Sequence, residues 1–436
     1  MAESQSTQGP ATPVYILRGH VAPIHALHLF AQNLRLVSGD AEGWIVIWDL
    51  VTKRPMTVWK GHQGAVLEVK GFTNGSGSSE IYTHGRDHKL CVWRIRSEDE
   101  PFLDKTLPVD VEVSNIPGNK TQPWLVHSLP VNALNFCAFS MTIINIGEGP
   151  SSPVAEDELR ISKPTILFAV PNALDSGGID IFHLPSERRM TTIPSDSSTT
   201  TGMVMAVSIF LSLSGDLFVV SAYEDGHVKV SVRRGPLSST SFEPTILSSN
   251  PWKWNTLYVS RPHTQPVLSL DISPSRDSFI TSSADAFIIK HPIPTGCEEG
   301  IPIVNYKEET PLKVMNTKHC GQQGLRWRTD GRIFATAGWD SRVRVYSGKT
   351  MKELAVLKWH KEGCYSVAFG DIDTLHPSTT RSEDPDTPET ALQTSQDHAR
   401  GFSLATIQNQ RNQKVQNTHW LAAGSKDGKI SLWDIY

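Results

Sequence analysis

Histidine, hydroxyl and carboxylate side chains recur along this chain at regular spacing, and these three types together could carry out acyl transfer. In that chemistry a histidine takes the proton of a serine or threonine, and a carboxylate orients the histidine. A catalytic triad occurs once, around one pocket, whereas here the same types return in several stretches. The repetition therefore indicates a structural hydrogen-bond network, and we expect no catalytic residues and no enzymatic activity.

A fourth residue type completes the repeated set, because an aromatic side chain lies six positions after an acid in a tight turn. The clearest copies run from Asp87 to Trp93 and from Asp427 to Trp433, and Glu42 takes the acid's place before Trp48. A small hydroxyl residue precedes most of the turn acids by four positions, and a histidine lies further upstream. The residues predicted to form these networks are His20, Ser38, Trp48, His62, Thr83, Asp87, Trp93, His319, Thr336, Asp340, His360, Asp427 and Trp433.

The copies recur with a period of roughly 40–45 residues, which predicts four-stranded blades arranged in a ring. Six copies are visible, and a fainter seventh lies between Asp87 and Asp225, with Val131–Phe136 as its first strand. We therefore predict an all-β fold, a seven-bladed WD40 β-propeller in a single domain covering residues 14–436. Because a closed ring leaves no exposed sheet edge, we expect an N-terminal strand at 14–18 to complete the last blade beside Ile430–Trp433.

Four segments do not fit the repeat. Residues 1–13 are expected to be a disordered N-terminus, and residues 97–130 and 145–164 to be inserts. The longest insert, 370–418, includes a run at 377–389 that is rich in acidic residues, hydroxyl residues and proline. Such a composition cannot bury enough apolar surface to fold, so we expect this insert to be disordered. It is either a tolerated surface loop or a tether that binds partners or is phosphorylated.

Composition and charge exclude several classes of function. The formal charge of −4, from 41 basic and 45 acidic residues, does not support direct nucleic-acid binding. The most apolar stretch, Met203–Leu213, ends at Ser214–Asp216 and predicts a buried strand rather than a membrane span. Five cysteines without paired spacing fit a reducing compartment, and His360 with Cys364 is too sparse for a metal site. We expect no metal and no cofactor.

The residues just before the turn acids are candidates for binding a partner, because this place in the repeat points at one mouth of a propeller. It holds Trp339 before Asp340, Arg86 before Asp87 and Lys426 before Asp427. Tryptophan and arginine dominate measured binding energies at protein interfaces. We therefore predict that Arg86, Trp339 and Lys426 share one face and contribute to partner docking.

Several segments resemble one particular family of WD-repeat proteins. The segments Pro13–His20, Leu36–Gly43, Thr83–Asp87, Leu129–Cys137 and Trp420–Gly428 are similar to the fungal ASTRA-associated protein 1 family, itself similar to the vertebrate G-protein β-subunit-like WD-repeat protein. The resemblance implies a nuclear subunit, also present in the cytoplasm, of the ASTRA assembly. That assembly is tied to chromatin remodelling and to a co-chaperone of the phosphatidylinositol-3-kinase-related kinases. The resemblance implies that the partners are the protein subunits of this assembly. It also implies that this chain is monomeric within the hetero-complex.

An alternative function remains open, namely a substrate receptor of a ubiquitin ligase or another WD-repeat adaptor. Such receptors often carry Trp-Asp-x-Arg at the end of a blade. Here Trp93-Arg94-Ile95-Arg96 has the final arginine without the aspartate, and Trp48-Asp49-Leu50-Val51 has the aspartate without the arginine.

Overall fold

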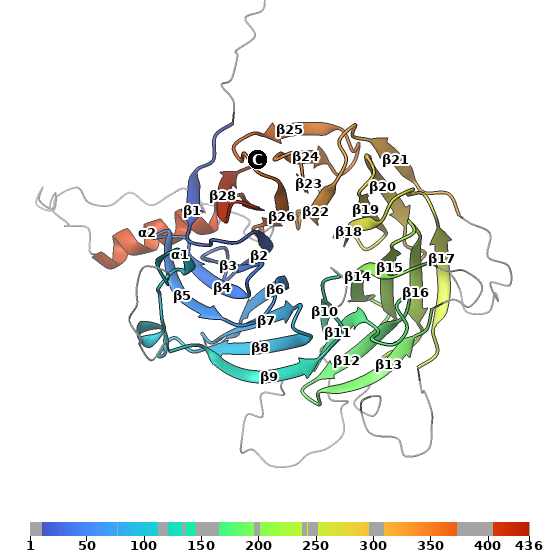
Figure 1. Ribbon diagram of the computed structural model, residues 1–436, viewed down its shortest axis with the longest axis horizontal. Helices are drawn as coiled ribbons and strands as arrows, with labels where there is room; N and C mark the ends of the chain where they lie inside the picture. The colour runs from blue at the N-terminus through green and yellow to red at the C-terminus, as the bar shows by residue number, and fades with distance from the viewer. Residues whose placement is uncertain are drawn as a thin grey trace, which may run out of the picture.

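The computed structural model describes residues 11–75, 77–111, 121–133, 137–144, 165–195, 201–237, 242, 252–295, 309–372 and 404–435. In these residues the chain forms seven four-stranded antiparallel sheets arranged in a ring around a central axis (Figure 1). The predicted seven-bladed, all-β propeller is confirmed. We call the sheets blades one to seven in the order of their innermost strands along the chain.

Each blade begins with its innermost strand and proceeds outward. Blade one contains β2 (Ile24–Phe30), β3 (Arg35–Asp40), β4 (Trp44–Asp49) and β5 (Arg54–Lys60). Blade two contains β6 (Val66–Thr73), β7 (Ser79–Gly85), β8 (Lys89–Ile95) and β9 (Trp124–Pro130). Blade three contains β10 (Ser140–Ile144), β11 (Thr165–Pro171), β12 (Ile179–Leu184) and β13 (Arg188–Ile193). Blade four contains β14 (Val204–Leu211), β15 (Leu217–Tyr223), β16 (Val228–Arg233) and β17 (Asn255–Ser260).

The remaining three blades follow the same order. Blade five contains β18 (Val267–Ile272), β19 (Ser278–Ser283), β20 (Phe287–Pro292) and β21 (Lys313–Asn316). Blade six contains β22 (Gln322–Trp327), β23 (Ile333–Gly338), β24 (Val343–Ser347) and β25 (Glu353–Leu357). Blade seven contains β26 (Cys364–Phe369), β27 (Trp420–Ser425), β28 (Lys429–Asp434) and β1 (Tyr15–Arg18).

The core lies between the blades. Second strands such as β15 and β23 are buried along their whole length because a neighbouring blade covers each of their faces. This explains why they are built of apolar and small residues without polar alternation. The buried apolar side chains of the described residues form seven clusters, one at each junction between neighbouring blades.

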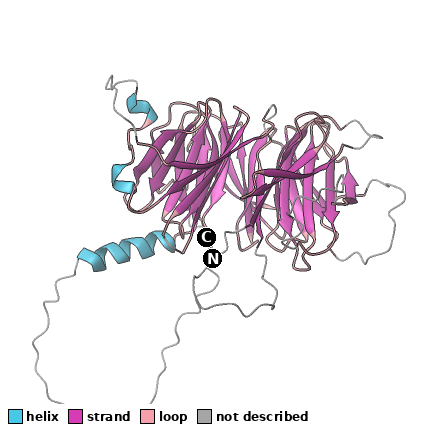
Figure 2. Cartoon of the chain, turned by 90° about the horizontal axis from the view of Figure 1, so that it is seen from below, coloured by secondary structure: helices cyan, strands magenta, loops and turns pink. Residues whose placement is uncertain are grey.

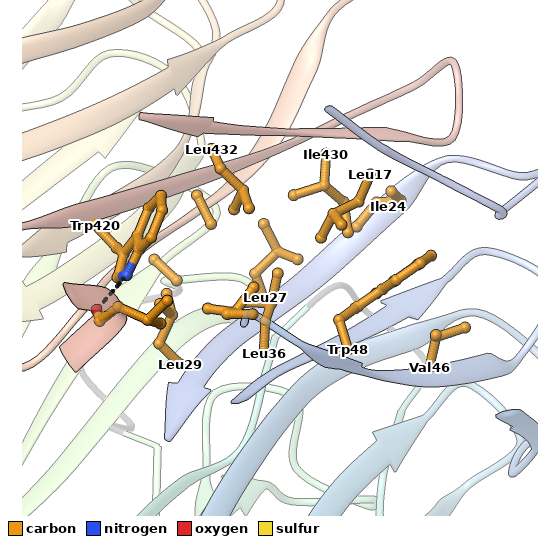
Figure 3. Packing of buried hydrophobic residues seen from close by; sticks show 14 of the residues in the cluster. Leu17, Ile24, Leu27, Leu29, Leu36, Val46, Trp48, Trp420, Ile430 and Leu432 are labelled. Carbon is orange, nitrogen blue, oxygen red and sulfur yellow. Dashed lines mark hydrogen bonds between the residues drawn. The ribbon is translucent and has the colours of Figure 1, made fainter. Parts of the chain in front are cut away.

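The N-terminal strand closes the ring as predicted. β1 pairs antiparallel with β28, from Tyr15 opposite Leu432 to Arg18 opposite Lys429. Leu17 is 1% exposed and packs beside Ile430 and Ile24 in the cluster between blades seven and one (Figure 3). Closure therefore rests on a strand pairing and on shared apolar packing. Residues 1–10 of the predicted disordered N-terminus lie outside the described residues.

The predicted insert at 97–130 differs from the structure, because its last seven residues are β9, the outer strand of blade two. β9 is half exposed and has only weak apolar alternation, so the sequence did not mark it as a strand. The residues before it form a strap that includes η1 (Glu100–Phe102) and α1 (Pro108–Val111). The strap runs along blade one, where Val58 N–H donates to Asp104 O at 2.7 Å.

Blade three also departs from the prediction. Its innermost strand is β10, which pairs Ile143 with Ile166, and not the predicted Val131–Phe136. Val131 and Ala133 are buried, which accounts for their apolar character, but they lie outside any strand. Residues 134–136 and the predicted insert at 145–164 lie outside the described residues.

The predicted disordered insert at 370–418 lies outside the described residues from 373 to 403, but its two ends are structured. Helix α2 (Leu404–Gln416) occupies the C-terminal end and projects from the face of the ring opposite the repeated turns (Figure 2). Its Val415 is 8% exposed, and Val415 O accepts the Trp420 indole N–H at 2.8 Å. None of the described helices is long and apolar enough to cross a membrane.

Candidate functional site

Blade two contains the complete network that the sequence predicts. His62 Nδ1 lies 2.8 Å from Asp87 Oδ1, and His62 Nε2 lies 2.8 Å from Thr83 Oγ1. The Trp93 indole N–H donates to the same Thr83 oxygen at 3.0 Å. Burial alone would raise the pKa of Asp87, but hydrogen bonds from His62 and from the Gln63 N–H hold that pKa below its usual 3.8. The network ties an inter-blade loop to the second and third strands.

Blade one has the same bonds with a different acid. His20 contacts Ser38 Oγ through Nε2 and Asp40 Oδ2 through Nδ1, both at 2.7 Å, and Trp48 donates to Ser38 at 2.9 Å. The predicted acid, Glu42, is instead exposed. Asp40 replaces it because Asp40 ends β3 and its other carboxylate oxygen accepts the turn N–H groups of Glu42 and Trp44.

Blade seven takes its hydroxyl from another strand. Ala423 stands where the other blades have serine or threonine, but it lies directly opposite Ser431 on β28. Ser431 Oγ contacts His360 Nε2 and accepts from Trp433, both at 2.8 Å. Asp427 lies 3.9 Å from His360 because its carboxylate binds Lys429 at 2.7 Å. Burial lowers the pKa of His360 to about 4, although the charge of Asp427 opposes this.

In blade six the histidine position is filled by an amide. Thr336 Oγ1 donates to Gln322 Oε1 at 2.7 Å, and the carboxylate of Asp340 binds the guanidinium of Arg344. The predicted network member His319 lies outside this network, with 44% of its side chain exposed and 3.7 Å from Asp340. Gln322 can replace it because an amide oxygen accepts the same hydroxyl bond.

Blade five builds its network from two histidines. His263 contacts Thr281 at 2.8 Å and Asp285 at 3.0 Å, and His291 contacts Thr281 at 3.0 Å from the position that holds tryptophan elsewhere. The central hydroxyl residues of the networks in blades one, two, five, six and seven are 0% exposed. A buried hydroxyl cannot reach a substrate, so these networks are structural. The described residues contain no group of three or more histidine, cysteine or acidic side chains that could hold a metal.

The residues just before the turns share one face of the ring. In six blades the N–H of this residue donates to the loop that immediately precedes the innermost strand of its own blade, at 2.8–3.0 Å. Each of these residues therefore lies beside the start of an innermost strand, close to the central axis. We call the surface that they define the mouth face. The six residues are Ala41, Arg86, Glu224, Ala284, Trp339 and Lys426.

Trp339 is held in a defined orientation on the mouth face. Its ring covers Gly321 so closely that a Cβ atom there would clash with the ring, and its indole N–H donates to Gln323 Oε1 at 2.8 Å. The side chain nevertheless keeps 48% of its surface exposed. Trp339 is therefore an exposed aromatic ring with a fixed orientation. Gly321 beneath it has φ +73°, in the left-handed region of the backbone.

The neighbouring blades extend this surface. Tyr365 on blade seven stacks on His25 on blade one, with ring centroids 5.4 Å apart and planes 3° apart. Burial lowers the pKa of His25, the charge of Asp40 opposes this shift, and the charge of Arg86 on blade two lowers the pKa further. We call Trp339, Gln323, Lys426, Tyr365, His25 and Arg86 the mouth cluster, which crosses blades six, seven, one and two.

Sequence reasoning placed Arg86, Trp339 and Lys426 on this face but missed the inner-strand members. His25, Gln323 and Tyr365 are each the second residue of an innermost strand. An alignment of the innermost strands with one another would have found this shared position. Arg86 and Lys426 are exposed at the surface.

The ring of four-stranded blades, the buried networks and the turn geometry define a seven-bladed β-propeller of the WD-repeat class. The chain belongs to the ASTRA-associated protein 1 family, whose model matches residues 13–433. It is 66% identical to ASTRA-associated protein 1 of Penicillium rubens over 100% of this chain and 99% of that protein. The corresponding identities are 57% for the Aspergillus flavus protein, over 100% of both chains, and 31% for the Schizosaccharomyces pombe protein, over 98% and 99%.

Proposed function

We propose that this chain is a non-catalytic scaffold subunit of the ASTRA complex. Membership of the ASTRA-associated protein 1 family across the whole propeller supports this proposal. In that complex it would serve chromatin remodelling and the maturation of phosphatidylinositol-3-kinase-related kinases through their co-chaperone. Its place of action would be the nucleus, with a share in the cytoplasm.

The observation that supports a docking role most directly is the mouth cluster. Trp339 offers an exposed aromatic ring whose orientation is already set by Gly321 and Gln323, so little freedom is lost on binding. Arg86 and Lys426 add positive charge at the same face. Aromatic and arginine side chains supply most of the energy of protein interfaces. We infer that partner subunits dock on this cluster.

The test is affinity purification of the full-length chain from its host, followed by mass spectrometry of the ASTRA subunits and the kinase co-chaperone. Trp339→Ala should weaken partner binding by about 2 kcal/mol or more, roughly thirtyfold, while leaving the melting temperature unchanged. The triple variant with Arg86→Ala and Lys426→Ala should recover still less partner.

Glu224→Ala is the matched control, because Glu224 occupies the same turn position on blade four. It should recover partners as the unaltered chain does. Full recovery of partners by a correctly folded triple variant would move the docking surface away from the mouth cluster.

A further inference from the structure

An ion pair crosses the axis of the propeller. Glu68 is on β6 of blade two and Arg326 is on β22 of blade six, on opposite sides of the ring (Figure 1). Blades seven and one separate them on one side, and blades three to five on the other. Nevertheless, Arg326 Nη2 donates to Glu68 Oε2 at 2.6 Å, with the Glu68 side chain 5% exposed.

Two more charged side chains join this pair. Asp271 on β18 of blade five accepts the Trp327 N–H at 2.6 Å, directly beside Arg326. Burial alone would lower the pKa of Arg326, but the charges of Glu68 and Asp271 raise it. Burial lowers the pKa of Lys70 on blade two, and the charges of Glu68 and Asp271 oppose that shift. Glu68 and Arg326 thus make the contact that crosses the axis, and Asp271 lies beside Arg326 on the neighbouring blade five.

We propose that Glu68 and Arg326, with Asp271 beside Arg326, form an axial brace, an ion pair that holds blade two at a fixed distance from blades five and six. The apolar clusters join only neighbouring blades, so small displacements between blades can add up around the ring. A bond across the axis removes that freedom.

The brace spans the ends of the mouth cluster. Trp339 lies on blade six and Arg86 on blade two, the same two blades that the Glu68–Arg326 pair connects. Gln323, which holds the Trp339 indole, is three residues before Arg326 on β22. The brace thus fixes the separation of the cluster's outer members. This docking consequence rests on the proposed function, whereas the brace itself does not.

A double-mutant cycle in the full-length chain tests the brace. Arg326→Gln should lower the melting temperature by about 4–6 °C, because it leaves the buried Glu68 carboxylate without its partner. Glu68→Gln should lower it less, because the Arg326 side chain is 29% exposed. The double variant should lose less than the sum of the two. The exposed pair Arg96–Glu98, at 3.4 Å, is the control, and its two glutamine variants should have near-zero effects. Strictly additive losses for Glu68 and Arg326 would overturn the proposal.

A milder variant gives a readout that does not depend on large losses of stability. Asp271→Asn keeps an oxygen to accept the Trp327 N–H and removes only the charge. If the brace exists, amide hydrogen exchange should rise in β6 of blade two, three blades away from the substitution. A rise confined to blades four, five and six would show that Asp271 is not part of the brace.

Partner recovery separates the docking consequence from the brace. Asp271→Asn should reduce recovery of ASTRA subunits although every residue of the mouth cluster is intact. Undiminished recovery, together with faster exchange in β6, would overturn only the claim that the brace fixes the docking surface. Undiminished recovery by the variants of Trp339, Arg86 and Lys426 would instead move the docking surface away from the mouth cluster and leave the brace untouched. Absence of ASTRA subunits from the purification of the unaltered chain would overturn the proposed function.

Discussion

At the centre of each complete blade network is one hydroxyl oxygen that contacts a histidine on one side and an aromatic ring nitrogen on the other. The residues that surround it change from blade to blade. Asp40 replaces the turn acid in blade one, Ser431 supplies the hydroxyl in blade seven, and Gln322 replaces the histidine in blade six. The bond pattern persists because a buried polar group must keep a partner, whichever side chain provides it.

Replacing the central hydroxyl of blade two should therefore destabilise the fold. Thr83→Val keeps the shape but leaves the His62 imidazole and the Trp93 indole without their shared partner, which should cost about 1–3 kcal/mol. Urea unfolding of the two chains measures the difference. Thr310→Val, at an exposed position, is the control and should be near neutral. An unchanged midpoint for Thr83→Val would show that the network adds no stability.

The histidine of blade seven should make stability depend on pH. Its pKa is about 4 in the folded chain and 6.5 when unperturbed, so between these values only the unfolded chain binds the proton. Acidification through this window therefore favours unfolding, by up to about 3 kcal/mol at its lower end. His360→Gln should flatten the slope of unfolding free energy against pH between 4.5 and 6.5. An identical slope in both chains would contradict the lowered pKa.

At the scale of elements, segments outside the repeat connect blades that are already neighbours. The strap from blade two crosses blade one and reaches the junction between blades seven and one, where Val109 N–H donates to Gly19 O at 3.0 Å. On the face from which α2 projects, Asn33 binds both ends of the long insert. Asn33 reaches them because it ends a turn of three residues with positive φ, Ala31, Gln32 and Asn33. Both segments are therefore anchored to the propeller by specific hydrogen bonds.

Removing the Asn33 amide should release helix α2. Asn33→Gly tolerates φ +65° but loses the bonds to Asp371 O, Asp371 N–H and Gln416 O, at 2.7–3.2 Å. Amide exchange should rise by about tenfold in α2, since each net bond is worth roughly 1 kcal/mol. Ala31→Gly, in the same turn, is the control because alanine has no side-chain bond to lose. Equal protection of α2 in both variants would show that Asn33 does not anchor the helix.

At the scale of the whole molecule, the chain closes on itself twice. β1 completes blade seven along the rim, and the Glu68–Arg326 pair connects opposite blades at the axis. These contacts act on different degrees of freedom. The strand covers an open sheet edge, and the ion pair limits how far the ring can flatten or shear. Together they restrain the blades that carry the mouth face.

Deletion of residues 1–18 should destabilise the entire propeller. It exposes the edge of β28 and removes Leu17 from the cluster between blades seven and one, where loss of a buried leucine side chain alone costs about 2–5 kcal/mol. Differential scanning calorimetry should show one transition at a clearly lower temperature. A chain that lacks only residues 1–12 retains β1 and should melt as the intact chain does. If the chain that begins at Gly19 melts at the same temperature, ring closure does not depend on β1.

The sequence by itself determined the number of blades, their turns and the strand that closes the ring, because the short-range geometry of the turns repeats within each copy. The fixed step from Asp87 to Trp93 is one such local signal. Only the tertiary structure decided that Asp40 and Ser431 complete their networks, since a strand register selects them. The tertiary structure also decided the axial pair of Glu68 and Arg326, 258 positions apart, and the hydrogen bond from Asn33 to the end of α2. No local pattern encodes such contacts, because ring closure alone brings these residues together.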